Sequence, residues 1–424
     1  MDTDERKSNM SEKKKIDWKK YLIIFIIASG TTVMYNLPYL KSTFYDPMRE
    51  ALGLSHQELG NLISMYGILA TILYFPSGFL ADKFSAKKLL SFSLIASGVL
   101  GFYFATFPSY GALLFIFAAW GVTTIFTFWA ASVKVVRMLG DKDEQGKLFG
   151  FNEGLSGIAG IVVSFIGLYL FETFSDVTIG FKYVVWMDSA LSILCGVLLF
   201  FIIKEKKVEG VDKVGLRETL SAVKLPKAWL IGGIIFSTYM VFSSLTYLNP
   251  YLSDIFLVSS AVIGALAIIR TYAIKLGASP LAGIIVDKVG SSIQVMKVGF
   301  VGVAVCELIF LLLPRQQSLG VVAILMMLVL SIVIFGFRGI YFATVAESNI
   351  PVKISGGVIG LASFVGFCPD AFFYTLVGGW LDQSDAGYTY LFALCLACSI
   401  LGFACCVALH KMNQKEKAAA SQAA

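Results

Sequence analysis

The chain has 424 residues, of which 57% are hydrophobic and only 15% are charged. Soluble domains carry about 25% charged residues, so this apolar excess needs lipid as a second apolar environment. The composition therefore excludes a soluble enzyme and indicates an integral membrane protein. The apolar residues fall in long blocks and not in the alternating segments of about ten residues that membrane barrels show, which predicts membrane-spanning helices.

Apolar blocks of about 20 residues, the length that crosses a bilayer as one helix, follow one another along the chain. We predict twelve spans, at residues 19–43, 57–81, 88–107, 110–136, 148–172, 181–203, 228–253, 258–285, 293–313, 318–346, 354–380 and 388–410. Little of the chain remains for a large soluble domain.

The distribution of positive charge predicts the orientation of these spans. Most of the 34 Lys and Arg residues fall in every second connection, and positively charged connections stay on the cytoplasmic side. This places both termini in the cytoplasm and puts Lys41, Arg49, Lys182 and Arg315 on the outside. The net charge of +6 then reflects topology, and no nucleic-acid partner is expected.

A weak internal duplication indicates two halves. YNLPYL at 35–40 recurs as YLNPYL at 247–252, and GFLADK at 78–83 recurs as GIIVDK at 283–288, each about 210 residues later. A glycine pair at 146 and 150 recurs at 356 and 360 with a similar offset.

We therefore predict two pseudo-symmetric six-helix bundles, at 19–203 and 228–410, joined by the basic cytoplasmic linker 204–227. Cytoplasmic tails are expected at 1–18 and 411–424, largely disordered.

The segment GFLADKFSAKKLL at 78–90 resembles the motif of the major facilitator superfamily, Gly-x-Leu-x-Asp-Arg-x-Gly-Arg-Lys. Lys83 and Ser85 depart from that motif, and the second copy has Lys288 in place of the Arg. The resemblance extends over 19–411. It implies an all-α membrane protein with the major facilitator fold, monomeric and without a cofactor.

The same motif predicts a gate at the cytoplasmic ends of the spans. The carboxylate of Asp82 can pair with Lys134 or Arg137, and such a pair can form in one conformer and break in the other. A purely topological anchor is the alternative. The candidate gate residues are Gly78, Asp82, Lys83, Arg137, Glu153, Gly283, Asp287 and Lys288.

Residues 35–60 and 338–370 resemble a bacterial inner-membrane branch near the oxalate:formate and organophosphate:phosphate antiporters. Like the oxalate carrier, the chain has an Arg midway along the eighth span, here Arg270. It lacks that carrier's second cation in the eleventh span, where Pro369 and Asp370 stand instead. It also lacks the first-span Arg of the organophosphate carriers, which makes phosphate-ester exchange doubtful.

Charged residues inside the spans are the main site candidates, because each costs about 2.5–3.5 kcal/mol at the bilayer centre. Arg270 lies too deep to reach either surface, and its guanidinium can hold a carboxylate, sulfonate or phosphate. We predict that it binds substrate, with a structural ion pair as the alternative. Arg338 is either a second binding cation or the partner of Asp370 or Glu347.

Asp370 is the candidate for proton coupling, with a permanent Asp–Arg pair as the alternative and Glu347 as a further candidate. Glu153 is expected to balance Arg137 or Lys134. Asp188 and Glu307 are expected to lie close enough to the membrane faces to be solvated. The uncharged side chains expected to line the substrate path are Tyr35, Asn36, Tyr39, Tyr247, Asn249 and Tyr374.

Several chemistries are disfavoured. The chain has two histidines, seven cysteines that all fall within spans, and no ATP-binding loop, so neither a metal site nor an enzyme is predicted. The prediction is a secondary transporter in the cell inner membrane of a bacterium. It would move a small organic anion by alternating access, as an antiporter or a proton symporter. The alternatives are a carrier of neutral sugars or drugs and a non-transporting membrane sensor.

Overall fold

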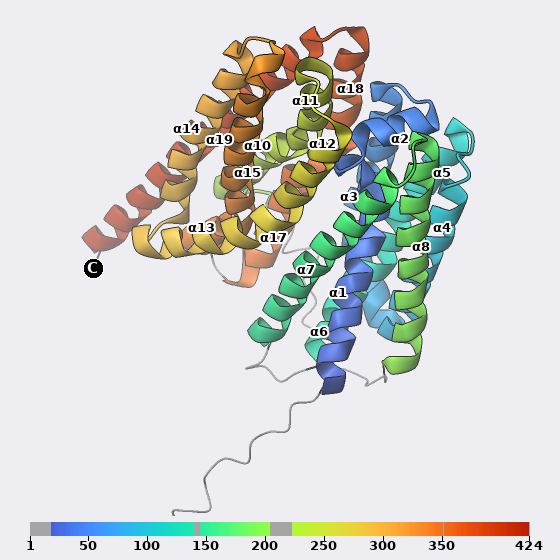
Figure 1. Ribbon diagram of the computed structural model, residues 1–424. Coiled ribbons are helices and arrows are strands. Elements are labelled where there is room, and N and C mark those ends of the chain that lie inside the picture. Colours follow the sequence, from blue (N-terminus) through green and yellow to red (C-terminus); the bar gives the residue numbers. More distant parts are fainter. Residues whose placement is uncertain (1–17, 140–144, 204–222, 351, 424) are drawn as a thin grey trace, which may run out of the picture.

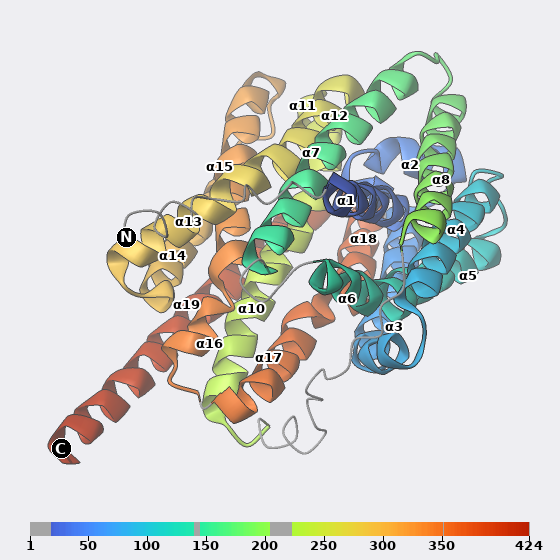
Figure 2. The same cartoon turned by 90° about the horizontal axis from the view of Figure 1, so that it is seen from below.

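The computed structural model describes residues 18–139, 145–203, 223–350 and 352–423, and every regular element in these ranges is helical. Figure 1 shows two groups of helices that lie against each other at one end and spread apart toward the other. We refer to them as the N-terminal group, α1–α8, and the C-terminal group, α10–α19. Figure 2 shows the same separation from below, with α7 beside α12.

The N-terminal group contains α1 (Trp18–Tyr39), η1 (Leu40–Ser42), α2 (Tyr45–Leu52), α3 (His56–Lys83), α4 (Ala86–Phe104), α5 (Tyr110–Gly121), η2 (Val122–Trp129), α6 (Ala130–Met138), α7 (Gln145–Glu172) and α8 (Val177–Ile202). Local signals define several helix ends. Ser55 and Glu58 form a reciprocal capping box at the start of α3. Gly53 ends α2 in the left-handed conformation, which glycine adopts without strain.

The C-terminal group contains α10 (Pro226–Ser244), η4 (Leu245–Tyr247), α11 (Leu248–Phe256), α12 (Ser260–Ile268), η5 (Ile269–Ile274), α13 (Lys275–Val289), α14 (Ser292–Leu312), η6 (Gln317–Leu319), α15 (Gly320–Ile340), α16 (Ala343–Glu347), α17 (Val352–Phe367), η7 (Cys368–Ala371), α18 (Phe373–Gln383) and α19 (Ala386–Ala423). Pro226 starts α10, where its missing N–H has no helical partner to lose.

Eleven segments in the described part of the chain are long and apolar enough to cross a membrane. The predicted span 57–81 corresponds to α3, a 28-residue helix that is not among these eleven, so the count of twelve stays a prediction. Large apolar side chains such as Ile72, Phe115, Phe201 and Leu312 are exposed, which suits an outer face in contact with lipid.

Six predicted spans are interrupted where we expected continuous helices, and the tenth of them is broken by a turn at Tyr341 and Phe342, between α15 and α16. The first, seventh and eleventh spans contain the 3-10 segments η1, η4 and η7, and the fourth and eighth contain the π-helical segments η2 and η5. Pro38 precedes η1 and Pro369 lies in η7, and proline removes a backbone donor from a helix. Apolar content alone does not reveal such breaks.

The expectation of a disordered C-terminal tail was wrong. Helix α19 continues through Ala423, in a segment rich in Lys, Glu, Gln and Ala, which are strong helix formers. Its extension is also anchored, because Lys227 Nζ lies 2.6 Å from the carboxylate of Glu416. Residues 1–17 of the predicted N-terminal tail 1–18 and residues 204–222 of the linker 204–227 lie outside the described residues, and Trp18 begins α1.

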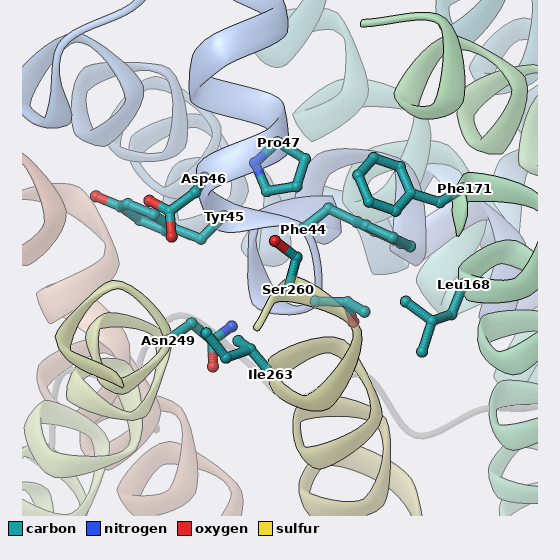
Figure 3. A pocket seen from close by; sticks show the side chains of 10 residues that line it. Phe44, Tyr45, Asp46, Pro47, Leu168, Phe171, Asn249, Ser260 and Ile263 are labelled. Carbon is teal, nitrogen blue, oxygen red and sulfur yellow. The ribbon is translucent and has the colours of Figure 1, made fainter. Parts of the chain in front are cut away.

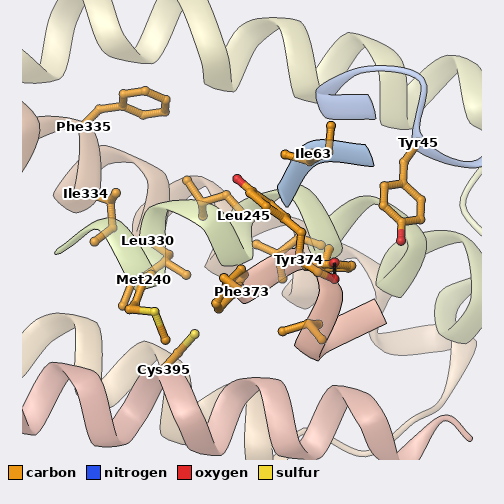
Figure 4. Close-up of a cluster of buried hydrophobic side chains, with 14 of the residues drawn as sticks. Tyr45, Ile63, Met240, Leu245, Leu330, Ile334, Phe335, Phe373, Tyr374 and Cys395 are labelled. Atoms are coloured by element: carbon orange, nitrogen blue, oxygen red, sulfur yellow. Dashed lines mark hydrogen bonds between the residues drawn. The ribbon is translucent and has the colours of Figure 1, made fainter. Parts of the chain in front are cut away.

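One apolar core runs through both groups. Figure 4 shows part of it, in which Tyr45 and Ile63 of the N-terminal group share a cluster with Phe373 and Tyr374 of the C-terminal group. The most extensive contact between the groups joins α3 to α18. It depends on close backbone approach, because a Cβ on Gly60 would overlap the carbonyl of Tyr374.

Candidate functional site

Three buried charges lie on the interrupted helices. Lys41 lies in η1, Arg270 in η5 and Asp370 in η7, within the first, eighth and eleventh predicted spans. Irregular backbone within a membrane is tolerated where it is buried in protein or lines a binding path. Discontinuous helices of this kind form substrate and ion sites in transporters. The interruptions therefore place the candidate site between the two groups.

Lys41 is the most deeply buried of these charges and was not predicted to be inside. Its side chain is 1% exposed, and Nζ lies 2.9 Å from the centroid of the Tyr374 ring. Nζ has no hydrogen-bond acceptor among the described residues. We had placed Lys41 in an outer connection. That was wrong because Lys41 belongs to η1, at the end of the predicted span 19–43, and its side chain lies inside the protein.

Asp370 lies between two cations. Its Oδ2 accepts hydrogen bonds from Tyr239, at 2.7 Å, and Tyr39, at 3.5 Å, whereas Oδ1 has no partner in the described structure. Lys41 of the N-terminal group and Arg338 of the C-terminal group both lie within electrostatic range of this carboxyl. Neither forms an ion pair within 4.0 Å with it, so the charges are close without being locked together.

Arg338 is half-buried and stacks on aromatic rings. Its guanidinium carbon lies 3.9 Å from the centroid of Phe242 and 5.9 Å from that of Tyr239. It is not paired with Glu347, whose carboxylate receives hydrogen bonds from Ser291, Ser292 and the backbone N–H of Ile293. Glu347 thus caps the start of α14, whereas the Arg338 side chain lies within hydrogen-bonding reach of the Tyr341 hydroxyl.

Arg270 binds backbone carbonyls. Nη1 donates to the carbonyl oxygen of Leu245 at 2.6 Å, and Nη2 donates to that of Ser42 at 3.5 Å. Leu245 lies in η4 and Ser42 in η1, so this buried guanidinium joins two helix interruptions across the two groups. No carboxylate lies within 4.0 Å of it among the described residues.

The predicted Tyr and Asn side chains divide into two sets. Tyr35, Asn36 and Tyr39 are half-buried, and Asn36 Oδ1 accepts a 2.6 Å hydrogen bond from Tyr272 of η5. Tyr247 and Asn249 are buried and bind backbone carbonyls, those of Tyr374 and Ser42. Asn249 therefore joins the two groups, whereas the Tyr247 bond lies within the C-terminal group, and neither side chain has much surface to offer a substrate. Tyr374 is buried as well, and its ring contacts Lys41.

The two groups are joined by hydrogen bonds at the end of the molecule that carries α2, here termed the α2 end. The Asp382 carboxylate accepts from the backbone N–H groups of His56 and Gln57, each at 2.8 Å, at the start of α3. Ser253 Oγ donates to Asp46 at 2.8 Å. Burial raises the pKa of Asp46, and this hydrogen bond opposes the shift.

A small cavity of about 20 Å³, enough for about one water molecule, lies at the same end. Figure 3 shows Asp46, Phe44 and Phe171 of the N-terminal group facing Asn249 and Ile263 of the C-terminal group around it. This cavity is therefore too small to hold an organic substrate.

The opposite end has looser contacts. Lys275 Nζ and Glu153 lie 3.9 Å apart across the groups, with side chains 52% and 68% exposed. Of the predicted gate residues, Lys83, Asp287 and Lys288 are exposed, and nothing lies within 4 Å of a Cβ built on Gly283. Gly78, Asp82 and Arg137 lie on α3 and α6, but their side chains fall outside the described part of the structure, and the predicted latch remains a prediction.

Two acids expected to be solvated are buried instead. Asp188 lies 11 residues beyond Val177, the first residue of α8, about 16 Å along the helix, because α8 begins there and not near 181. Glu307 is covered by the packing of α14 against α19. Three further residues at or beside the contact between the groups, Tyr239, Tyr272 and Asp382, belong to no motif or charge pattern in the sequence and were not predicted.

The seven cysteines are free thiols, five of them buried. In the described part of the chain, no group of three His, Cys, Asp or Glu side chains could hold a metal ion.

Comparison with known proteins gives a consistent result. The model of the Major Facilitator Superfamily matches residues 21–369. The chain is 32% identical to inner membrane protein YihN of Escherichia coli K12, over 94% of this chain and 97% of that protein. It is 30% identical to inner membrane protein YqcE of the same strain, over 88% and 90%.

Among solved structures, the nucleoside transporter NupG superimposes with a TM-score of 0.72 at 14% identity, covering 92% of this chain and 99% of that one. This likeness establishes a shared fold, that of an all-α membrane protein. Together with the family match, it confirms the resemblance noted in the sequence: the chain belongs to the Major Facilitator Superfamily.

Proposed function

We propose that the protein is a secondary transporter that carries a small organic anion across the cell inner membrane by alternating access. One observation carries this proposal. The ammonium of Lys41 is buried between the groups without a hydrogen-bond acceptor in the described structure, and Lys41 and Arg338 both lie within electrostatic range of a single carboxyl, that of Asp370. Such an excess of positive charge favours an anionic substrate, since an uncompensated buried charge is costly.

In this proposal Arg338 makes the first contact with the substrate. Its guanidinium is half-buried, fixed against Phe242, and can bind a carboxylate or sulfonate through two parallel hydrogen bonds. Tyr39 and Tyr239 can turn their hydroxyls from Asp370 to the ligand. Arg270 instead holds η1 and η4 in place, a role supported by its two carbonyl acceptors.

Asp370 provides a route to coupling. An anion bound by Arg338 and Lys41 would compete with the Asp370 carboxylate for the same cations, which favours protonation of that carboxylate by water. Proton symport would use this protonation. Anion exchange would need only that the loaded site reorients faster than the empty one.

The moving parts in this proposal are residues 19–203 and 228–410, with both termini in the cytoplasm. The α2 end then faces outward, and the spread end of Figure 1 faces the cytoplasm. The names of YihN and YqcE support placement in the inner membrane. A monomer suffices, because the candidate site lies within one chain.

A thermal-shift screen of the purified protein tests this function. The ligands are small carboxylates, sulfonates, phosphate esters, neutral sugars and cationic drugs. We expect one anion class to raise the unfolding temperature, with about 2.7 kcal/mol of stabilisation at a hundred times its dissociation constant. Arg338→Gln should lose this response.

Arg315→Gln is the matched control, because Arg315 is an exposed arginine bound to Asp385 and Thr389 at the α2 end. Stabilisation by neutral or cationic compounds alone would contradict the anionic substrate. If the stabilisation by an anion persists in Arg338→Gln but is lost in Arg270→Gln, Arg270 is the substrate-binding residue, as the sequence predicted.

A further inference from the structure

A second buried acid, Asp188 of α8, lies apart from the proposed substrate site. Its side chain is 1% exposed, and Oδ1 has no hydrogen-bond partner in the described structure. The polar neighbour of this carboxyl is the side-chain amide of Asn36 in α1. A buried carboxyl with one free oxygen is costly and is retained in membrane proteins mainly for function.

Asn36 connects Asp188 to the other group of helices. Its Oδ1 accepts a 2.6 Å hydrogen bond from the Tyr272 hydroxyl, which lies in the π-helical segment η5. The Tyr272 ring packs on α7, where a Cβ on Gly160 would overlap it. Ser164 of α7 also lies within hydrogen-bonding reach of the Tyr272 hydroxyl. Tyr272 is therefore inserted between the groups, with Asn36 holding its tip.

The surroundings of Asp188 contain few charges. Of the elements packed against α8, α1 contributes Asn36, and α4 presents Gly98 and Gly101 to the adjacent Ser189. Tyr272 is a titratable group within electrostatic range of Asp188, and no ion pair within 4.0 Å joins Asp188 to a described Lys or Arg of α1, α4 or the other two helices packed against α8, α2 and α7. Protonation of Asp188 is thus not opposed by a cation, in contrast to Asp370.

We propose that Asp188 is a proton-binding site that controls the hydrogen bond between Asn36 and Tyr272. When Asp188 is ionised, it accepts from the Asn36 N–H and leaves Asn36 Oδ1 free to accept from Tyr272. When a proton from water forms the acid, its O–H donates to Asn36 Oδ1 and competes with the Tyr272 hydroxyl. Proton binding therefore weakens a link between the groups and favours the conformer open at the α2 end. This inference rests on the proposed alternating access.

Spin-label distances test the inference without a known substrate. The labels are placed on Thr173→Cys and Ser259→Cys, two exposed positions at the α2 end on opposite groups. Cys368 and Cys405, the cysteines that are not fully buried, are replaced by Ala. Between about pH 8 and about pH 5, we expect the ratio of long to short distances to rise about fivefold, the effect of losing one ordinary hydrogen bond.

Asp188→Asn should show, at every pH, the high ratio of long to short distances that the unmodified chain reaches at about pH 5. The reason is that the amide of Asn can donate to Asn36 as the protonated acid does. Tyr272→Phe should also remove the pH response while keeping the ring. The matched control is Glu307→Gln, which changes another fully buried acid within one group and should retain the response.

A pH response that persists in Asp188→Asn, or a two-population ratio that does not change with pH in the unmodified chain, would overturn this inference and leave alternating access intact. A single distance population in every variant and at every pH would overturn both.

Discussion

The two ends of the molecule are closed by different means. At the α2 end, a helix start is capped across the groups by Asp382, glycines let backbones touch, and Arg270 and Asn249 bind carbonyls of the partner group. At the opposite end, the polar contact that the structure describes between the groups is an exposed ion pair, formed by Lys275 and Glu153.

The comparison indicates that the conformation closed at the α2 end is stabilised mainly by hydrogen bonds to backbone N–H and carbonyl groups. Carbonyls and N–H groups at helix interruptions make directed hydrogen bonds that solvent screens little, whereas an exposed ion pair contributes about 0–1 kcal/mol. The present state is therefore held at the α2 end, and variants there should change it most.

The largest effect is expected from adding bulk where α3 meets α18. Gly60→Ala would place a Cβ against the Tyr374 carbonyl, a rigid backbone group. The overlap should cost the closed α2 end about 1–3 kcal/mol and increase the population open there, measured by the spin-label pair at 173 and 259. Gly302→Ala is the control, since its Cβ would meet nothing within 4 Å. An unchanged distance distribution in Gly60→Ala would show that this contact does not hold the end closed.

The second-largest effect is expected from removing the buried charge of Lys41. Lys41→Met keeps most of the side-chain volume and removes a charge that has no acceptor, so the unfolding temperature should be maintained or rise by a few degrees. Anion-induced stabilisation should be lost. Lys275→Met, at the exposed end, should leave both measurements nearly unchanged. A marked loss of stability in Lys41→Met would mean that Lys41 is paired structurally.

A smaller effect is expected from the cap that crosses between the groups. Asp382→Asn should weaken the hydrogen bonds to His56 and Gln57 by about 0.5–2 kcal/mol and shift the distance ratio toward the open α2 end. Asp176→Asn is matched to it, because Asp176 caps α8 within one group through the N–H of Ile179. It should lower the unfolding temperature without altering the ratio. Equal shifts in both variants would argue against a role for the cap in closure.

The smallest effect is expected at the opposite end. Glu153→Gln removes an exposed pair with a separation of 3.9 Å, and stability should change by less than about 0.5 kcal/mol. Chemical denaturation in detergent at low and high salt would measure it. A clear salt-dependent loss would indicate that this pair is a stronger latch than its exposure suggests.

Sequence reasoning predicted the helical membrane fold and the family. Long apolar blocks and the motif at 78–90 can be recognised in the amino-acid sequence alone. It also selected Arg270, Arg338 and Asp370, because a charge inside an apolar span stands out. Whether these residues bind substrate remains a prediction.

The environment of each charge could not be predicted. Arg270 binds carbonyls of Leu245 and Ser42, which are distant in sequence and become accessible only because η4 and η1 break their helices. Lys41 was assigned to the wrong environment because a single turn of 3-10 helix decides whether it lies in a connection or in the interior. Glu347 carries no sequence mark that distinguishes a helix cap from a coupling acid.

The π-helical segment η5 has a consequence for the numbering of residues along the eighth span. A π turn contains one residue more than the α turn it replaces, so it is equivalent to a one-residue insertion that the fold has absorbed. Winding all six residues of Ile269–Ile274 as a regular α-helix, without deleting one, would rotate all that follows by about 100°. Lys275 would then face a different neighbour from Glu153 while Ile263 kept its place. The inner and outer halves of this helix are thus set in register by a single extra peptide unit.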